Sequence, residues 1–164
     1  MSDATGSAHS PTLSVSIVVY FPDPAWLRTT LETLVAALAH ACHAGAMRRA
    51  KIFLVDNQAD KSMSSFSAQL EDACKELDWI EAACIAGHGN IGYGRANNLA
   101  VARSSDADFH LVLNPDVKLA DDAITNALRY LQQHVACAMV SPVATAPDGQ
   151  PLYLAKRFPA LFTL

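Results

Sequence analysis

The stretch SVSIVVYFPDPAWLRTTLETL, residues 14–34, predicts the unit from which the fold is built. Its first part, Val15–Tyr20, is rich in β-branched residues and almost continuously apolar, which is typical of a strand covered on both faces in a parallel sheet. Asp23 and Pro24 then supply an N-cap and a first helical residue. Leucines follow at helical spacing, namely Leu27, Leu31, Leu34 and Leu38. The stretch therefore predicts a strand, a short loop and an amphipathic helix.

The same succession of strand and helix recurs along the chain. Further strands are predicted at residues 51–55, 79–85, 109–113 and 137–140, and further helices at residues 66–77, 95–103 and 124–131. Asp121 or Asp122 can cap the last helix. Pro147, Asp148 and Gly149 predict a turn between two short extended pieces. Strands that alternate with helices indicate an α/β fold with a mostly parallel sheet flanked by helices.

The composition is that of a globular domain. A chain of 164 residues suits one domain with a sizeable core, and a net charge of -4 gives no field for binding nucleic acid. The four cysteines lie far apart without a C-x-x-C pair, which favours a reducing compartment over a disulfide framework or a zinc site. Residues 1–12 are small and polar and predict a disordered lead-in. No apolar run approaches the roughly 20 residues that a membrane span needs.

Polar side chains gather at the carboxyl ends of the predicted strands, where open α/β sheets bind their ligands. These tips are Tyr20-Phe21-Pro22, Asp56-Asn57-Gln58, the loop 87–94, and Asn114-Pro115-Asp116. Each acid alone could equally cap a turn or end a strand. Two acids at one sheet edge, however, would repel each other unless a cation or a hydrogen-bonding ligand lay between them. We therefore expect one ligand site there, with Asp116 binding Mg²⁺ or Mn²⁺ together with substrate phosphates.

The loop GHGNIGYGRANN, residues 87–98, is open to two interpretations. Gly87, Gly89 and Gly92 have the spacing G-x-G-x-x-G between a strand and a helix, as in nicotinamide dinucleotide-binding domains. That fingerprint usually follows the first strand of its unit, whereas two complete units precede this loop. A plain flexible loop is the other interpretation, but it explains poorly why one loop–helix junction gathers Asn90, Arg95, Asn97 and Asn98.

The histidines give weaker signals. His40, Cys42 and His43 lie near the end of the first predicted helix, where histidine suits the negative end of the helix dipole, so we predict no metal site there. His88 and His110 could each act as a base, but the sequence indicates no partner for either.

Four motifs, in this order, resemble the family-2 glycosyltransferases. They are SIVVYFPDPAWLRTTLETL, FLVDNQAD, GNIGYGRANNLAVA and LVLNPDV, followed by SPVATAPDGQ and KRFPAL. The resemblance covers residues 14 to about 162 and is strongest to the bacterial rhamnosyltransferase-like branch that builds surface polysaccharides, in which Asn-Pro-Asp-Val stands where many relatives have Asp-x-Asp. It implies a GT-A type nucleotide-binding sandwich that transfers a sugar, with inversion, from a nucleoside diphosphate sugar to a saccharide or lipid-linked acceptor. A divalent metal would take part.

The resemblance also implies roles for the residues at the strand tips. Tyr20, Phe21 and Asp56 would hold a pyrimidine base, because Asp56 can accept the single N–H of a uracil or thymine ring. Asp116 would bind the metal, and Asn114, in place of a first acid, would make metal binding depend more on the donor phosphates. The loop would line the nucleotide through Asn90, Gly92, Gly94, Arg95 and Asn98, with its glycines allowing close approach of the backbone.

Two departures from the family pattern limit what this chain is expected to do. Gln58 and Ala59 stand where relatives usually carry Gly-Ser. The catalytic carboxylate and much of the acceptor site of the family lie in a second half, and nothing after Asp148 is acidic. We therefore expect residues 13–164 to form the donor half, without an assignable catalytic base. Self-association through the surface left exposed is also expected.

The expected location is cytoplasmic, with peripheral contact with the inner face of the membrane as an option. A non-catalytic nucleotide-binding module and a nicotinamide dinucleotide-binding domain are the alternative functions.

Overall fold

The structure is a computed structural model that describes residues 10–58, 64–146 and 148–152. The chain divides into two compact units, residues 1–125 and residues 126–164. The first unit contains the larger sheet and its helices, and the boundary falls inside the last helix.

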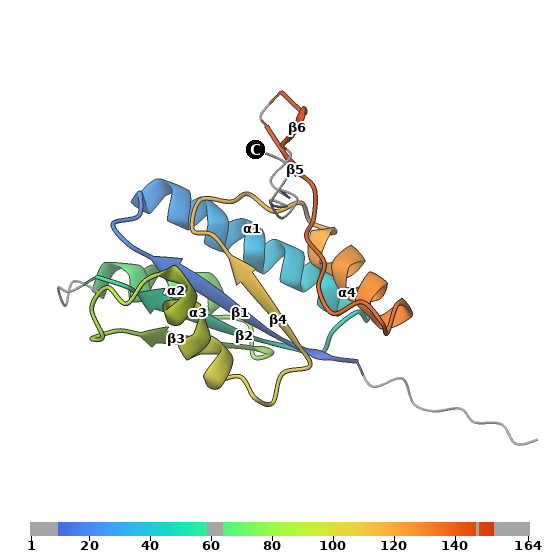
Figure 1. The fold of residues 1–164 in the computed structure, drawn as a ribbon, viewed down its shortest axis with the longest axis horizontal. Helices are drawn as coiled ribbons and strands as arrows, with labels where there is room; N and C mark the ends of the chain where they lie inside the picture. The colour runs from blue at the N-terminus through green and yellow to red at the C-terminus, as the bar shows by residue number, and fades with distance from the viewer. Residues whose placement is uncertain (1–9, 59–63, 147, 153–164) are drawn as a thin grey trace, which may run out of the picture. The chain divides into compact units, whose positions relative to one another are not determined.

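The first unit alternates strands and helices (Figure 1). In chain order its elements are β1 Thr12–Val19, α1 Pro24–His43, β2 Arg49–Asp56, α2 Ser64–Cys74, β3 Ile80–Ile85, α3 Tyr93–Ala102, β4 Phe109–Leu113 and the beginning of α4 Ala123–Gln133. The predicted fold class, an α/β sandwich with a parallel sheet flanked by helices, is therefore confirmed.

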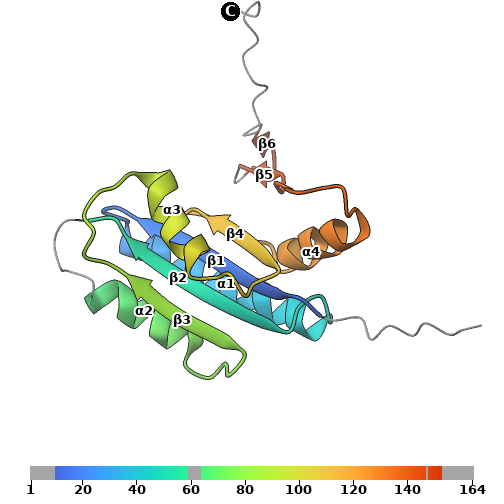
Figure 2. The same ribbon diagram turned by 60° about the horizontal axis from the view of Figure 1, so that its bottom comes forward.

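The four strands are parallel and lie in the order β3-β2-β1-β4. From β1 the chain first moves outward to β2 and β3, with α1 and α2 on one face of the sheet. It then crosses back to β4 through α3, which covers the other face (Figures 1 and 2). Right-handed crossovers require this change of face, because the direction of travel along the sheet reverses. The reversal creates a switch point beside the end of β1, which is where open α/β sheets bind ligands.

Packing on both faces positions the helices over the sheet. The four leucines predicted for the buried side of α1 are 0–1% exposed, and each contributes on the order of 2 kcal/mol of hydrophobic stabilisation. On the other face a core cluster consists of Val18, Phe53, Val55, Ile85, Ala96 and Ala100. The last two belong to α3 and are small, so the backbone of α3 can lie close to the sheet.

The beginning of α1 is formed as the sequence predicts. Asp23 is the N-cap, and its Oδ1 accepts hydrogen bonds from the N–H groups of Ala25 at 2.8 Å and Trp26 at 3.2 Å. Pro24 is the first residue of the helix, where its missing N–H costs nothing.

Other boundaries differ from the predictions by a few residues. β1 begins at Thr12 instead of residue 15, and Pro11 is buried, so the described part of the predicted lead-in packs onto the first unit; residues 1–9 lie outside the described residues. α2 ends at Cys74 instead of residue 77, because the N–H of Leu77 donates to Cys74 O at 3.0 Å and closes a turn. α4 begins at Ala123, so Asp122 directly precedes it.

The second unit contains most of α4 and a hairpin of β5 Ala144–Thr145 with β6 Pro151–Leu152. The predicted turn between these extended pieces is present, since Gly149 has φ 82° and donates its N–H to Ala146 O at 2.9 Å; Pro147 lies outside the described residues. The predicted strand at residues 137–140 is wrong. A strand needs the backbone groups of a neighbour, and in the described part of this unit β5 and β6 pair only with each other.

Candidate functional site

The register of the sheet places the tip of β2 beside the end of β1. Val19 pairs with Asp56, and the N–H of Asn57 donates to Val19 O at 2.9 Å. Asp56 is 1% exposed, and its Oδ1 accepts the N–H of Gln58 at 2.9 Å. Asp56 therefore closes the turn after β2, as an ordinary strand-ending aspartate would, but this bond uses only one of its two carboxylate oxygens.

The tip of β4 lies on the other side of β1. Ile17 pairs with Leu113, so Asn114 follows at the same edge of the sheet. Because β1 lies between β2 and β4, the backbones of the two tips are two strand spacings apart, about 10 Å. The spacing suits contacts with two different parts of one elongated ligand.

Asn57 fastens the glycine-containing loop to the tip of β2. Its Nδ2 donates to Asn90 Oδ1 at 3.0 Å, and its Oδ1 accepts the N–H of Ile91 at 3.1 Å. Asn90 Oδ1 also accepts the N–H of Gly92 at 3.0 Å. Asn90 is a candidate from the sequence, whereas Asn57 is noted there only as part of the tip of its strand. The signal in the sequence that could have identified Asn57 is its position directly after Asp56, the acid that ends the strand.

The beginning of α3 is fastened to the tip of β4. The hydroxyl of Tyr93, the first residue of α3, donates to Asn114 Oδ1 at 2.7 Å. Gly92 precedes the helix with φ 83°, a left-handed conformation that requires glycine, whereas Gly94 has ordinary helical geometry. The first turn of α3 is therefore connected by side-chain hydrogen bonds to both tips, through Asn90 to β2 and through Tyr93 to β4.

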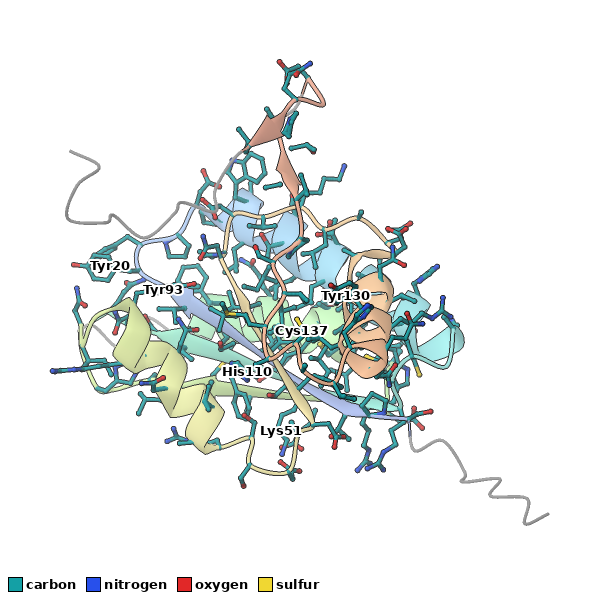
Figure 3. The ribbon with its side chains drawn as sticks, turned by 45° about the vertical axis from the view of Figure 1, so that its right-hand side comes forward. Tyr20, Lys51, Tyr93, His110, Tyr130 and Cys137 are labelled. Carbon is teal, nitrogen blue, oxygen red and sulfur yellow. The ribbon has the colours of Figure 1, made fainter. Side chains whose placement is uncertain are left out.

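Tyr20 and Phe21 form an exposed aromatic pair directly after β1. Their exposed fractions are 54% and 73%, and their ring centroids are 4.8 Å apart in an edge-to-face arrangement. Phe21 also has φ 48°, a left-handed conformation that costs a bulky residue roughly 1–3 kcal/mol. Neither the exposure nor the strain helps this chain to pack. Figure 3 shows Tyr20 at the same end of the sheet as Tyr93.

Asp116 lies in an exposed turn that α1 supports. The hydroxyl of Thr30 donates to Pro115 O at 2.8 Å, and the hydroxyl oxygen of Thr33 accepts the N–H of Leu119 at 3.2 Å. Asp116 itself is exposed. Within residues 10–58, 64–146 and 148–152, no three His, Cys, Asp or Glu side chains are grouped so that they could hold a metal ion. Asp116 offers one exposed carboxylate, and its binding of a metal stays a prediction.

The other candidate residues are two residues of α3 and the histidines. Arg95 and Asn98 are both exposed on α3, and their contact with a nucleotide stays a prediction. His40 and His43 occupy the last turn of α1, as expected, and His40 Nδ1 lies 2.8 Å from the hydroxyl of Thr125. His88 donates from Nδ1 to Gly89 O at 2.7 Å, which holds the loop in shape.

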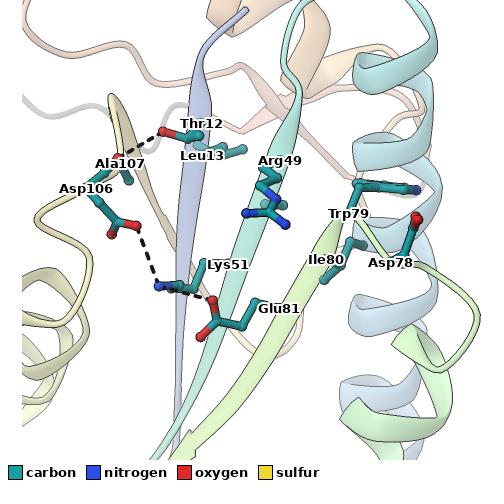
Figure 4. A pocket seen from close by; sticks show the side chains of 11 residues that line it. Thr12, Leu13, Arg49, Lys51, Asp78, Trp79, Ile80, Glu81, Asp106 and Ala107 are labelled. Atoms are coloured by element: carbon teal, nitrogen blue, oxygen red, sulfur yellow. Dashed lines mark hydrogen bonds and ion pairs between the residues drawn. The ribbon is translucent and has the colours of Figure 1, made fainter.

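A cavity of about 300 Å³ lies at the opposite edge of the sheet, at the amino ends of β1, β2 and β3 (Figure 4). Its walls carry both signs of charge. Lys51 Nζ lies 3.2 Å from a carboxylate oxygen of Glu81 and 3.8 Å from one of Asp106. The cavity lies at the amino ends of the strands and is therefore separate from the candidate site at their carboxyl ends.

The structure defines a parallel α/β protein whose polar candidate residues lie at the carboxyl edge of its sheet. The sequence matches no protein-family model and no curated protein. Among solved structures, the chain is similar to the crystal structure of S. aureus TarS 1-349, with a TM-score of 0.49 and 15% sequence identity. The match covers 76% of this chain and 33% of that chain, so this chain spans about a third of the length of the solved structure. A similarity of this extent does not assign a function.

No helix in the described part of the chain is both long enough and apolar enough to cross a membrane.

Proposed function

We propose that this chain binds a nucleoside diphosphate sugar and forms the donor-binding part of a glycosyltransferase. The observation that carries the proposal is the arrangement along the carboxyl edge of the sheet. Tyr20, Phe21 and Asp56 lie at the adjacent tips of β1 and β2, and Asn114 and Asp116 follow β4, with the tips of β2 and β4 about 10 Å apart. The resemblance to family-2 glycosyltransferases supports the same division, since it implies base binding for the first group and metal binding for the second.

The first group suits a pyrimidine base. A uracil or thymine ring carries one N–H, which a carboxylate such as Asp56 can accept with the oxygen that does not bind Gln58. The exposed rings of Tyr20 and Phe21 offer an apolar surface on which a planar base can pack. A ligand of this kind would also account for the strained backbone of Phe21.

The beginning of α3 suits the diphosphate. The first N–H groups of a helix have no partner within the helix, and they favour anions. Gly94 lies in this first turn, where a Cβ would meet nothing within 4 Å, so the packing of the chain gives no reason for glycine. Glycine in a helix costs about 1 kcal/mol relative to alanine. Close approach of a phosphate to the backbone supplies a reason for it.

The exposed carboxylate of Asp116 suits Mg²⁺ or Mn²⁺ bound jointly with the donor. Such ions often take one or two carboxylates and fill their remaining positions with substrate phosphates and water. Asn114 adds an amide without a second negative charge, so we expect metal and donor to bind together. When bound, the metal would neutralise charge on the departing diphosphate.

The finer parts of the proposal concern the reaction. Deoxythymidine diphosphate rhamnose is the preferred donor, the acceptor is a saccharide or a lipid-linked saccharide, and transfer proceeds with inversion. We assign no catalytic base among the described residues, so the 164-residue chain is expected to bind the donor without transferring sugar by itself. A cytoplasmic location, with contact with the inner face of the membrane, and self-association belong to the same proposal.

Calorimetric titration tests the proposal. The purified chain should bind deoxythymidine diphosphate or uridine diphosphate more tightly with Mn²⁺ than without it, and more tightly than it binds NAD. Asp116→Ala should abolish the effect of Mn²⁺. Asp121→Ala, which removes another exposed aspartate nearby in the chain, should leave the effect intact. Tighter binding of NAD than of either pyrimidine nucleotide would refute the proposal in favour of a nicotinamide dinucleotide-binding domain.

A further inference from the structure

A buried polar network lies between the sheet and α3. Ser14 and Ser16 of β1 are both 0% exposed, and the half-buried His110 of β4, which is labelled in Figure 3, lies within hydrogen-bond distance of both. Nδ1 of His110 is 2.7 Å from Ser14 Oγ, and Nε2 is 2.9 Å from Ser16 Oγ. Ser16 Oγ in turn donates to Oδ1 of Asn97, a buried residue of α3, at 2.7 Å. Three elements that are distant in sequence are thus joined through four polar side chains.

Asn97 sets the direction of the hydrogen bonds in this network. Its Nδ2 donates to Tyr93 O at 3.0 Å, so its Oδ1 must be the acceptor for Ser16. The single hydrogen of the Ser16 hydroxyl is then used, and its oxygen must accept from Nε2–H of His110. In a neutral imidazole Nδ1 is left as an acceptor, which suits the hydroxyl of Ser14.

The state of His110 agrees with this assignment. Burial lowers the pKa of His110, which favours the neutral ring. The Ser14 hydroxyl also lies 3.3 Å from Phe109 O, but its distance to Nδ1 is shorter. With the ring hydrogen on Nε2, both ring nitrogens have a hydrogen-bond partner, whereas a hydrogen on Nδ1 would leave Nε2 facing the Ser16 oxygen with no hydrogen between them.

The network continues into the candidate site. Asn97 holds the carbonyl of Tyr93, and the Tyr93 hydroxyl donates to Asn114 Oδ1 at 2.7 Å. His110 lies in β4, and Asn114 directly follows that strand. The hydrogen bonds therefore lead from β4 to β1, from β1 to α3, and from α3 back to the end of β4. Buried polar groups are costly unless they are hydrogen-bonded, but a fully bonded network specifies one arrangement of the elements that it joins.

We propose that His110 is a positioning residue for the ligand site: through Ser16 and Asn97 it holds the first turn of α3, and through Tyr93 it holds the tip of β4 beside Asp116. The identity of the ligand rests on the proposed function, whereas the network does not. His110 touches no reacting atom in this role, so it is not a catalytic base.

The direction of the hydrogen bonds in this network can be tested without a ligand. Long-range proton–nitrogen NMR correlation of the His110 ring, in the full chain at neutral pH, should report a neutral ring with its hydrogen on Nε2. Ser16→Ala removes the acceptor of that hydrogen and should change the ring signals, which a ring held only by packing would not show. A hydrogen on Nδ1 in the unmodified chain would overturn the assignment.

A matched pair of variants tests the positioning role. In His110→Gln the side-chain amide can reach the place of Nε2 and donate to Ser16, whereas in His110→Asn it reaches only the place of Nδ1 beside Ser14. His110→Gln should therefore preserve slow exchange of the Ala96 amide, which donates to Gly92 O at 3.0 Å in the first turn of α3. His110→Asn should accelerate that exchange and weaken binding of deoxythymidine or uridine diphosphate with Mn²⁺ by about tenfold, the value of one hydrogen bond of roughly 1.4 kcal/mol.

Further variants separate positioning from general destabilisation. Tyr93→Phe removes only an exposed hydroxyl and should weaken nucleotide binding severalfold while leaving the melting temperature unchanged. A purely structural role predicts that His110→Gln and His110→Asn bind nucleotide equally well when folded, and that result would overturn the inference. If the unmodified chain binds neither nucleotide, the proposed function fails. The inference is then decided by amide exchange alone, and equal exchange of Ala96 in the two variants overturns it.

Discussion

Replacing Asn57 with alanine should release the loop 87–92 from the sheet. Asn57 is 4% exposed, and its side chain makes hydrogen bonds with Asn90 Oδ1 at 3.0 Å and with the N–H of Ile91 at 3.1 Å. Each bond contributes about 1 kcal/mol net. Ile91 is only partly buried, so water can partly replace the lost acceptor of its N–H. We therefore expect Asn57→Ala to lower the free energy of unfolding by about 2 kcal/mol. This value counts the two lost hydrogen bonds and adds little for the Ile91 N–H that is left without its protein acceptor.

Urea denaturation and amide exchange measure this effect. A loss of about 2 kcal/mol corresponds to a fall of roughly 4–8 °C in melting temperature for a chain of this size. The amides of Ile91 and Gly92 should exchange faster, because the loop loses its attachment to β2. Asn98→Ala is the matched control, since it makes the same chemical change at an exposed position of α3.

The result that would refute this reasoning is specific. Ordinary surface substitutions change the free energy of unfolding by no more than roughly 0.5 kcal/mol. If Asn57→Ala has an effect this small and the Ile91 amide exchanges at an unchanged rate, the Asn57–Asn90 connection does not hold the loop.

Three further predictions concern the cap of α1, the metal and pH. Asp23→Ala should lower the free energy of unfolding by about 1 kcal/mol in urea, through loss of the N-cap; an unchanged value would mean that the cap bonds are not formed. Asp116→Ala should lose the Mn²⁺ dependence of nucleotide binding in calorimetry, and retained dependence would place the metal elsewhere. Burial lowers the pKa of His110 in the folded chain, so as the pH falls this histidine is protonated more readily in the unfolded chain. The free energy of unfolding should therefore decrease as the pH drops through about 6.5. His110→Gln should reduce that dependence in urea titrations, and an identical pH profile would contradict it.

Local patterns in the sequence were sufficient for most of the elements. Asp23, Pro24 and the leucine spacing determine the start and the buried side of α1 because capping and amphipathic spacing act within a few residues. The apolar segments ending at Asp56 and Leu113 likewise identify β2 and β4 as buried parallel strands. The predicted strand at residues 137–140 failed for the complementary reason, since an apolar segment becomes a strand only when a partner edge is available.

The sequence by itself also determined that polar residues follow the strands, which is why Tyr20, Asp56 and Asp116 were candidates. Only the tertiary structure decided which tips are neighbours, because the strand order β3-β2-β1-β4 depends on crossovers between distant segments. That order places one strand, β1, between the two tips that carry the acids. The bonds of Asn57 with Asn90, and of His110 with Ser14 and Ser16, join residues 33 to 96 positions apart. Such contacts follow from the register of packed elements, and no local pattern specifies that register.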